Sequence, residues 1–158
     1  IWLVARADSA LRPIQPTGNT RKDIAAVKAQ LQGIQVLGIE NTCLDPSLFG
    51  LKEVGAHAIR FQGNLNELIP AMLNRDGEAA LVDSPVALVA LEKWPGRIKV
   101  IGPLSPMQDM AYAFSQCAPK LRASFNQFFN QKKKDGTFVR LAKKYYPDIL
   151  TYHPGFFE

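Results

Sequence analysis

The chain contains no long hydrophobic run, and none of its apolar segments approaches the roughly 18 residues that a membrane-spanning helix needs. It begins at Ile1 with no methionine, no basic region and no signal-like apolar stretch. We therefore expect any targeting segment to lie outside this sequence, and the terminus does not indicate the localisation. With 47% hydrophobic and 21% charged residues in 158, the composition is typical of a water-soluble globular protein of one domain, or of a piece of a larger one.

Residues that carry metal, redox or acyl-transfer chemistry are scarce. Cys43 and Cys117 match neither CxxC nor a zinc spacing, and they could form one disulfide in an oxidising compartment or remain free buried thiols. His57 and His153 have no Cys, Ser or Asp at a spacing that suggests a catalytic triad. The GxGxxG and GxxxxGK(S/T) loops are absent, so nucleotide binding through them is unsupported. The sequence predicts no metal site, no cofactor and no enzyme.

A formal charge of +5 and a pI near 9.3 raise the question of nucleic-acid binding. The basic residues are spread along the chain, except for Lys132, Lys133 and Lys134 at the end of a predicted helix, where cations oppose the helix dipole favourably. This cluster is either a solvated helix end or a docking or anion-binding surface. We expect no nucleic-acid partner.

Two kinds of apolar segment, one typical of strands and one typical of helices, alternate along the chain. Short apolar runs predict strands, and runs with apolar residues at helical spacing predict helices. The predicted strands are 1–6, 34–39, 57–61, 78–83, 97–103 and 111–114. The predicted helices are 22–33, 45–55, 64–74, 84–94, 118–134 and 135–146, with Asp23, Asp45, Asn64 and Ser84 as the first four N-caps. Within 64–74, Pro70 is expected to cost a backbone hydrogen bond. Alternation from 34 to 101 predicts an α/β fold of three layers, in which helices cover both faces of a mostly parallel sheet.

Ligands of open α/β sheets bind beyond the carboxyl ends of strands. The first such place is the polar loop Glu40, Asn41 and Thr42, which leads to a predicted helix start. Backbone N–H groups there, beside a hydroxyl, suit a carboxylate or a phosphate. Alternatively, Thr42 and Asp45 only cap the helix.

The second place is Asp83, between the strand 78–83 and the helix 84–94. Its carboxylate could serve the helix dipole, for about 0.3–1 kcal/mol, or pair with a cation on a ligand. We include the adjacent Ser84, the expected N-cap, among the candidate ligand-binding residues.

From Ile1 to Pro147 the sequence resembles the second half of a family 3 extracellular solute-binding protein, with the type II periplasmic binding fold. The matching segments, in order, are VARADS, KDIAAVKAQLQGIQVLGIENT, NLNELIPAML, AALVDSPVALVALEK, KVIGPLSPMQDMAYAF and APKLRASFNQFFNQKKKDGTFVRLAKKYYP. The last, with DGT between two helices and KKYYP at its end, is the most specific.

The resemblance implies a two-lobed protein that captures an amino-acid-like or polar anionic solute in its cleft and delivers it to an ABC transporter permease, in the periplasm or outside the cell. It also implies that Asp83 pairs with a ligand α-amino group and that Thr42 faces the ligand α-carboxylate. Two alternatives are a sensory domain of a membrane receptor kinase and a dehydratase, for which Glu40 would be the extra cleft carboxylate.

The sequence departs from the family in two respects. Asn41 stands where the family loop usually has Gly, which adds a side chain where backbone comes close to ligand. The family's first lobe, with its aromatic platform and carboxylate-binding Arg, has no counterpart, and Arg6 does not match that Arg. We expect 7–102 to form the second lobe, and 1–6 and 103–158 to be the hinge strand and the C-terminal part of an incomplete first lobe. Its uncovered Phe faces predict a homo-oligomer, an exchanged contact or a missing first half.

Overall fold

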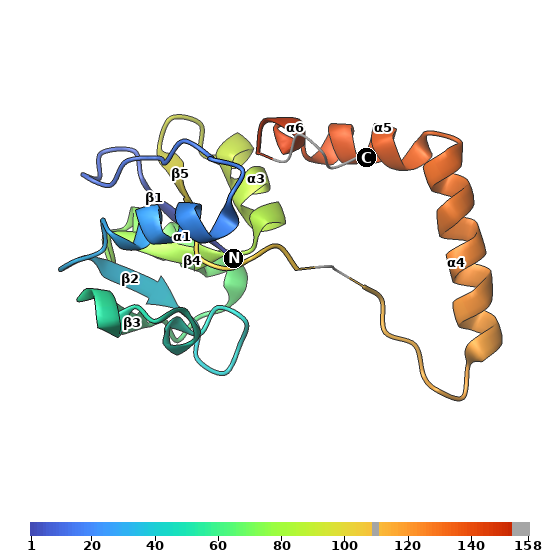
Figure 1. Ribbon diagram of the computed structural model, residues 1–158, viewed down its shortest axis with the longest axis horizontal. Coiled ribbons are helices and arrows are strands. Elements are labelled where there is room, and N and C mark those ends of the chain that lie inside the picture. The colour runs from blue at the N-terminus through green and yellow to red at the C-terminus, as the bar shows by residue number, and fades with distance from the viewer. Residues whose placement is uncertain (109–110, 153–158) are drawn as a thin grey trace. The chain divides into compact units, whose positions relative to one another are not determined.

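The computed structural model describes residues 1–108 and 111–152, and it divides into two compact units, Ile1–Met107 and Gln108–Glu158 (Figure 1). None of the helices among the described residues is long and apolar enough to cross a membrane.

The first unit is built on a five-stranded sheet of order β3-β2-β4-β1-β5. The strands are β1 (Trp2–Arg6), β2 (Gln35–Gly38), β3 (His57–Arg60), β4 (Ala79–Val82) and β5 (Ile98–Pro103). β2 is parallel to both β3 and β4, whereas β1 runs antiparallel to both β4 and β5. Four strands therefore share one direction, which confirms the mostly parallel sheet expected from the alternation.

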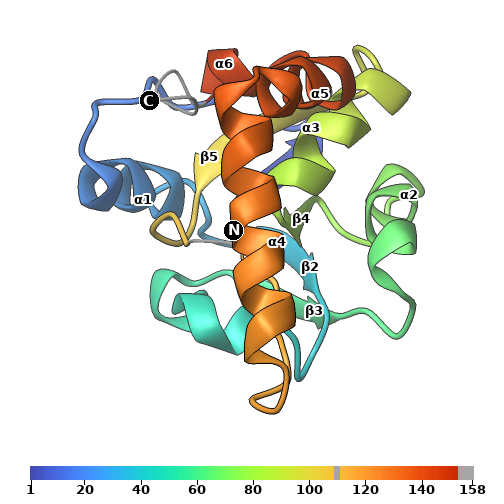
Figure 2. The same ribbon diagram turned by 90° about the vertical axis from the view of Figure 1, so that its right-hand side faces the viewer.

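Helices lie on both faces of this sheet. They are α1 (Thr20–Lys28) on one face, and α2 (Leu68–Leu73) and α3 (Ser84–Lys93) on the other (Figure 2). The strands between them are apolar because both faces are covered: every residue of β4 is buried, as are the first four residues of β1. The three-layer α/β architecture is confirmed.

The sequence-based boundary placed residues 1–6 with the C-terminal part of the chain. In the structure Trp2–Arg6 lies between β4 and β5 as an interior strand of the first unit. Its side chains contribute to the same core, in which Leu3, Val4 and Ala5 are fully buried. The assignment of lobes remains a proposal.

Two predicted helix starts were wrong. The N-cap of α1 is Asn19, whose side chain accepts from the Lys22 N–H at 3.1 Å, whereas Asp23 is buried inside the helix and accepts from the Thr17 hydroxyl at 2.7 Å. At α3 the N-cap position is held by Asp83, and Ser84 is the first helical residue. Sequence patterns locate helices better than their ends, since several polar residues compete for each cap.

The predicted helix 45–55 is instead two 3₁₀ turns, η1 (Pro46–Phe49) and η2 (Lys52–Val54). Gly50 and Gly55 end them in the left-handed conformation, with φ of 59° and 73°. Asp45 is the N-cap of η1, as expected. The glycine spacing leaves too few residues between stops for an α-helix.

The predicted capping box is present. The Asn64 side chain and the Glu67 side chain bind each other's backbone at the start of η3 (Leu65–Glu67), which continues into α2. Pro70 is the third residue of α2, in its first turn, where proline is tolerated.

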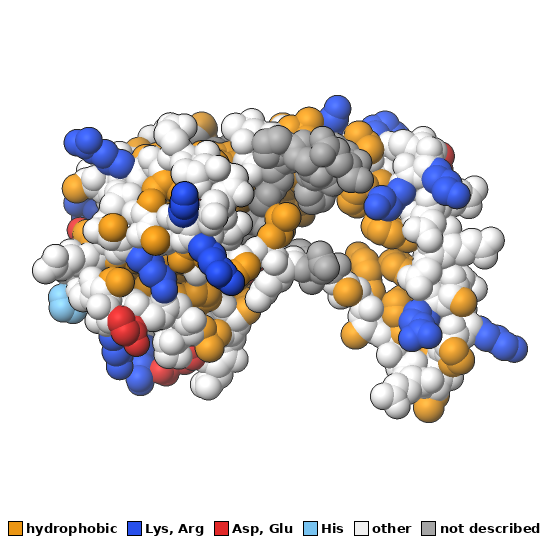
Figure 3. All heavy atoms as spheres, in the orientation of Figure 1, with side chains coloured by type: hydrophobic (Ala, Val, Ile, Leu, Met, Phe, Trp, Pro, Cys, Tyr) orange, Lys and Arg blue, Asp and Glu red, His pale blue; other side chains and the backbone are white. Residues whose placement is uncertain are grey.

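The second unit contains α4 (Pro119–Lys134), α5 (Thr137–Tyr145) and α6 (Ile149–Tyr152). The strand predicted at 111–114 does not form, because a strand needs a partner and the described part of this unit is otherwise helical. Tyr112 and Phe114 instead pack on Phe125, with ring centroids 5.0 Å and 5.3 Å away. Apolar side chains gather along one side of α4 (Figure 3).

Candidate functional site

The expected ligand residues leave two neighbouring strands at the same edge of the sheet. β2 and β4 are parallel, with Leu37 opposite Ala80, and Glu40 and Asp83 each lie three residues further on. The two carboxylates therefore leave the sheet at its carboxyl edge, where ligands of α/β proteins bind. β1 begins at this edge as well, because Trp2 lies opposite Val82.

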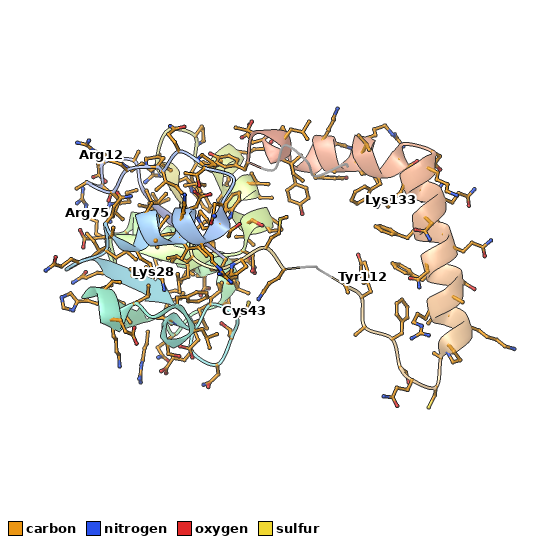
Figure 4. All side chains as sticks on the ribbon, in the orientation of Figure 1. Arg12, Lys28, Cys43, Arg75, Tyr112 and Lys133 are labelled. Carbon is orange, nitrogen blue, oxygen red and sulfur yellow. The ribbon has the colours of Figure 1, made fainter. Side chains whose placement is uncertain are left out.

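Both segments lie near the Ile1 amino group. Burial lowers the pKa of the Ile1 amino group, and this effect is opposed by the nearby Asp83 and Cys43, which raise the pKa. Asp83 follows β4 and Cys43 lies on the loop after β2 (Figure 4). Both strand ends therefore lie within electrostatic range of a single group.

The loop after β2, residues 39–47, is closed by its own hydrogen bonds. The Thr42 hydroxyl donates to the Ile39 carbonyl at 2.7 Å and accepts from the Leu44 N–H at 3.0 Å. Asn41 has a positive φ of 58°, a conformation that Asn tolerates better than most residues. The Asn41 that departs from the family's Gly thus keeps a backbone shape that Gly would favour.

The acceptor at the centre of this loop is Asp45. One carboxylate oxygen accepts from the Asn41 N–H at 3.0 Å, and the other accepts from the Ser47 N–H at 2.9 Å and the Ser47 hydroxyl at 2.7 Å. The bond from the Ser47 hydroxyl is the largest cause of a lowered pKa of Asp45, followed by the two backbone bonds. The charged form of Asp45 is the one that holds the loop.

Glu40 is engaged as well. Its carboxylate pairs with the Arg60 guanidinium at 2.7 Å, and Arg60 ends β3 opposite Gly38 of β2. The charge of Arg60 also contributes, as the smallest cause, to the lowered pKa of Asp45. Both members of the Glu40–Arg60 pair are partly exposed, and such a pair adds little to stability.

Asp83 differs from the other two acids. It occupies the N-cap position of α3 with extended backbone, but its side chain makes no capping hydrogen bond to the described backbone of that helix. It is partly buried at the strand end. An N-cap carboxylate normally accepts from the helix's first N–H groups, so Asp83 retains acceptor capacity for another donor.

An apolar groove of about 150 Å³ lies elsewhere, between η3, α2 and α3. Lys93 approaches the Trp94 ring to 4.8 Å at one end of it. The residues that line it are Leu65, Asn66, Ile69, Val86, Val89, Ala90, Lys93 and Trp94. None of the five expected ligand residues belongs to this groove.

The structure places Glu40, Asn41 and Thr42 in one loop and puts Asp83 and Ser84 at the end of the neighbouring strand. Their contact with a ligand remains a proposal. Sequence reasoning missed Arg60, although it is a charged residue one position before the end of the predicted strand 57–61, which was the available signal.

The cysteines and histidines do not add to this candidate site. Both Cys43 and Cys117 are free and exposed, so neither the disulfide nor the buried thiol is found. His57 is exposed on β3, and His153 lies outside the described residues. The part of the chain that the structure describes holds no group of three His, Cys, Asp or Glu that could bind a metal ion.

Comparison with known proteins gives the fold a class. No protein-family model matches the chain. A curated relative, a membrane-bound lytic murein transglycosylase F of Desulfosudis oleivorans, is 31% identical over 86 residues, which are 54% of this chain and 19% of that protein.

Solved structures match over 92% of the chain. They include the L-cystine solute receptor of Neisseria gonorrhoeae (20% identity, TM-score 0.58) and ArgBP of T. maritima (19%, TM-score 0.66). A third is the second substrate binding domain of a putative amino acid ABC transporter from Streptococcus pneumoniae (18%, TM-score 0.62). This chain spans 55%, 57% and 60% of those chains, respectively, and about a fifth of the curated relative.

These neighbours are solute-binding proteins, and the chain has their fold. The first unit is a lobe of the type II periplasmic binding fold, with a mixed sheet between two layers of helices. The chain covers little more than half of the proteins that carry this fold in full.

Proposed function

We propose that this chain is the second lobe of a solute-binding protein, with C-terminal elements of the first lobe. It captures a small amino-acid-like solute in the periplasm or outside the cell and passes it to an ABC permease. Asp83 carries the proposal. Its carboxylate stands at the ligand edge of the sheet without a capping bond to α3, and its charge suits a ligand ammonium group.

The other expected residues complete this proposed site. Ser84 begins α3 beside Asp83, whereas Glu40, Asn41 and Thr42 form the facing loop. The chain itself is proposed to be non-catalytic. Glu40, on which the dehydratase alternative depends, is paired with Arg60 at 2.7 Å.

A thermal-shift screen of the full-length protein against amino acids, organic acids and sugars tests the proposal. A solute that binds only the native state raises the melting temperature by mass action, by about 2.7 kcal/mol of stability at 100 times Kd. We expect an amino-acid-like solute to give the shift and Asp83→Asn to abolish it. Glu92→Gln, an exposed acid on the same helix, is the control. No shift with any solute, or an unchanged shift in Asp83→Asn, would refute the role.

The murein transglycosylase relative supports a second candidate, a ligand-binding module within a larger cell-wall-acting protein. The same lobe would then sense a solute rather than deliver it. Release of soluble fragments from purified murein by the full-length protein would favour this candidate. Uptake of the bound solute that depends on the protein would favour transport.

A further inference from the structure

The positive charge of the chain is concentrated in one stretch. Residues 119–147, which contain α4 and α5, hold eight of the 19 Lys and Arg residues but one of the 14 Asp and Glu residues. The rest of the chain is slightly acidic, with 11 cations against 13 acids. The one acid of the stretch, Asp135, pairs with Lys132 at 2.9 Å. The other seven cations are exposed, and none of them forms an ion pair with a described residue.

The two sides of α5 differ in character. Phe138 packs on Phe129 of α4, with ring centroids 5.5 Å apart. Arg140, Lys143 and Lys144 follow Phe138 by two, five and six residues, which at about 100° per residue places them on the opposite side of the helix. Figure 3 shows Lys and Arg side chains over α5 and the adjoining end of α4. The basic face is defined as these three residues together with the two lysines that end α4, Lys133 and Lys134.

Helix dipoles do not account for this charge pattern. Cations are favourable in the last turn of a helix and acids in the first, which explains the lysines that end α4 and α5. However, Lys120 and Arg122 lie in the first turn of α4, and neither helix has an acid in its first turn. Arg140, in the middle of α5, gains little from the dipole. The uniform sign of charge therefore favours an anionic partner outside the two helices.

The composition of the basic face fits a layer of lipid headgroups better than a protein surface. Protein interfaces are enriched in aromatic residues, Met and Arg and depleted in Lys, whereas four of the five residues of the basic face are Lys. A lysine is a point charge on a flexible stem, which suits many mobile phosphates rather than one fixed partner. Clusters of about four to eight Lys and Arg on an amphipathic helix are typical of binding to anionic lipid.

We propose that the basic face docks on the headgroups of an anionic lipid membrane. The contact is electrostatic and made at the level of the phosphates, so none of the described helices needs to enter the hydrocarbon layer. The apolar side of α4 and α5 stays available for a first lobe or a second copy of the chain. This inference goes beyond the proposed function and does not depend on solute capture.

Vesicle flotation with the full-length protein tests this docking. One kind of vesicle is phosphatidylcholine alone, and the other is an equal mixture of phosphatidylcholine and phosphatidylglycerol. The readout is the ratio of the partition coefficients for the anionic and the neutral vesicles, because an uncharged attachment elsewhere in the protein would raise both coefficients. The variant combines Arg140→Gln, Lys143→Gln and Lys144→Gln, since Gln is a good helix former.

The control removes the same net charge from the first unit. It combines Arg21→Gln, Lys22→Gln and Lys52→Gln, which change three exposed cations without an ion pair among the described residues. A second variant, Lys143→Arg with Lys144→Arg, keeps the charge of the basic face. Comparison of the three separates the position of the charge from its total amount and from the identity of the side chain.

The wild type should partition at least tenfold more strongly into the anionic vesicles. Each cation close to an anionic surface contributes roughly fivefold in affinity, so the Gln variant of the basic face should lower the ratio at least tenfold. The control and the Arg variant should keep the wild-type ratio. Added salt should lower the ratio for the wild type, because exposed charges are screened.

Three outcomes would overturn the inference. Equal partition of the wild type into both kinds of vesicle would show no preference for anionic lipid. Equal losses in the Gln variant and the control would show that net charge, and not the basic face, causes the binding. If only vesicles that contain the reconstituted permease bind the protein through these cations, the partner is an acidic protein surface. Solute capture would stand after any of these results, because it depends on residues of the first unit.

Discussion

The guanidinium of Arg6 donates a hydrogen bond of 2.8 Å to the carbonyl oxygen of Gly77, and the same nitrogen approaches the Met72 carbonyl at 3.3 Å. Arg6 ends β1, so these bonds tie that strand to the end of α2 and to the turn before β4. The Arg6 side chain is only 14% exposed. Arg6 therefore has a structural role at the edge opposite the candidate site.

Arg6→Gln is expected to lower the free energy of unfolding by about 1.5–3 kcal/mol, the range for a hydrogen bond from a charged group. Solute affinity should not change, since the residue lies at the other edge. Chemical denaturation measures the first effect and titration the second. The exposed Arg12→Gln, expected within about 0.5 kcal/mol of wild type, is the control. A loss of affinity without a loss of stability would contradict this assignment.

Gly38, the last residue of β2, allows the loop to fold back on the strand. A methyl group there would lie 2.5 Å from the Leu44 carbonyl oxygen and 2.6 Å from the Pro46 ring. Gly to Ala in a strand is normally stabilising by about 0.5–1 kcal/mol, but overpacking costs about 1–3 kcal/mol. The sign of the change in the free energy of unfolding, measured by denaturation, therefore shows which of the two effects is larger. Gly38→Ala should destabilise the protein. A gain in stability would show that the loop shifts to make room for the methyl group.

Acid should weaken the loop through Asp45. The folded-state pKa of this group is lowered by the hydrogen bonds from Ser47 and Asn41. A lowered folded pKa means that the contribution to stability is present above the unfolded value of 3.8 and is lost as the pH falls through the folded pKa. Melting temperatures measured from pH 5 down to 2.5 should fall less steeply for Asp45→Asn than for wild type. If the melting temperatures of wild type and Asp45→Asn fell equally with pH, the prediction would be contradicted. Asp76→Asn, which changes an exposed acid, serves as the control.

Sequence patterns predicted the sheet, the helices and their layers because hydrophobic periodicity reflects burial on each face. They also placed Glu40 and Asp83 beyond the carboxyl ends of their strands, and β2 and β4 are neighbours in the sheet. They did not predict that Asp45 would bind Asn41 and Ser47, since the closure of a loop depends on backbone shape rather than on periodicity. The expected start at Asp45 is present, but the helix predicted over 45–55 is not, because Gly50 ends η1 after one turn.

The second unit exposes large apolar side chains on two helices. Leu121 and Phe128 of α4 are 61% and 55% exposed, and Tyr145 of α5 is 57% exposed. Contiguous exposed apolar surface favours association. We therefore expect the 158-residue chain to self-associate when it is alone. When a first lobe is supplied, we expect that lobe to cover these side chains.

Light scattering coupled to gel filtration measures this self-association. The apparent mass of the chain should exceed 17.5 kDa and rise with concentration, and Leu121→Gln with Phe128→Gln should lower it toward that value. Leu48→Gln in the first unit changes a side chain that is 65% exposed and is the matched control. A concentration-independent mass of one chain would exclude self-association. Adding the first lobe should abolish association without any substitution, because the same apolar side chains are then buried within one molecule.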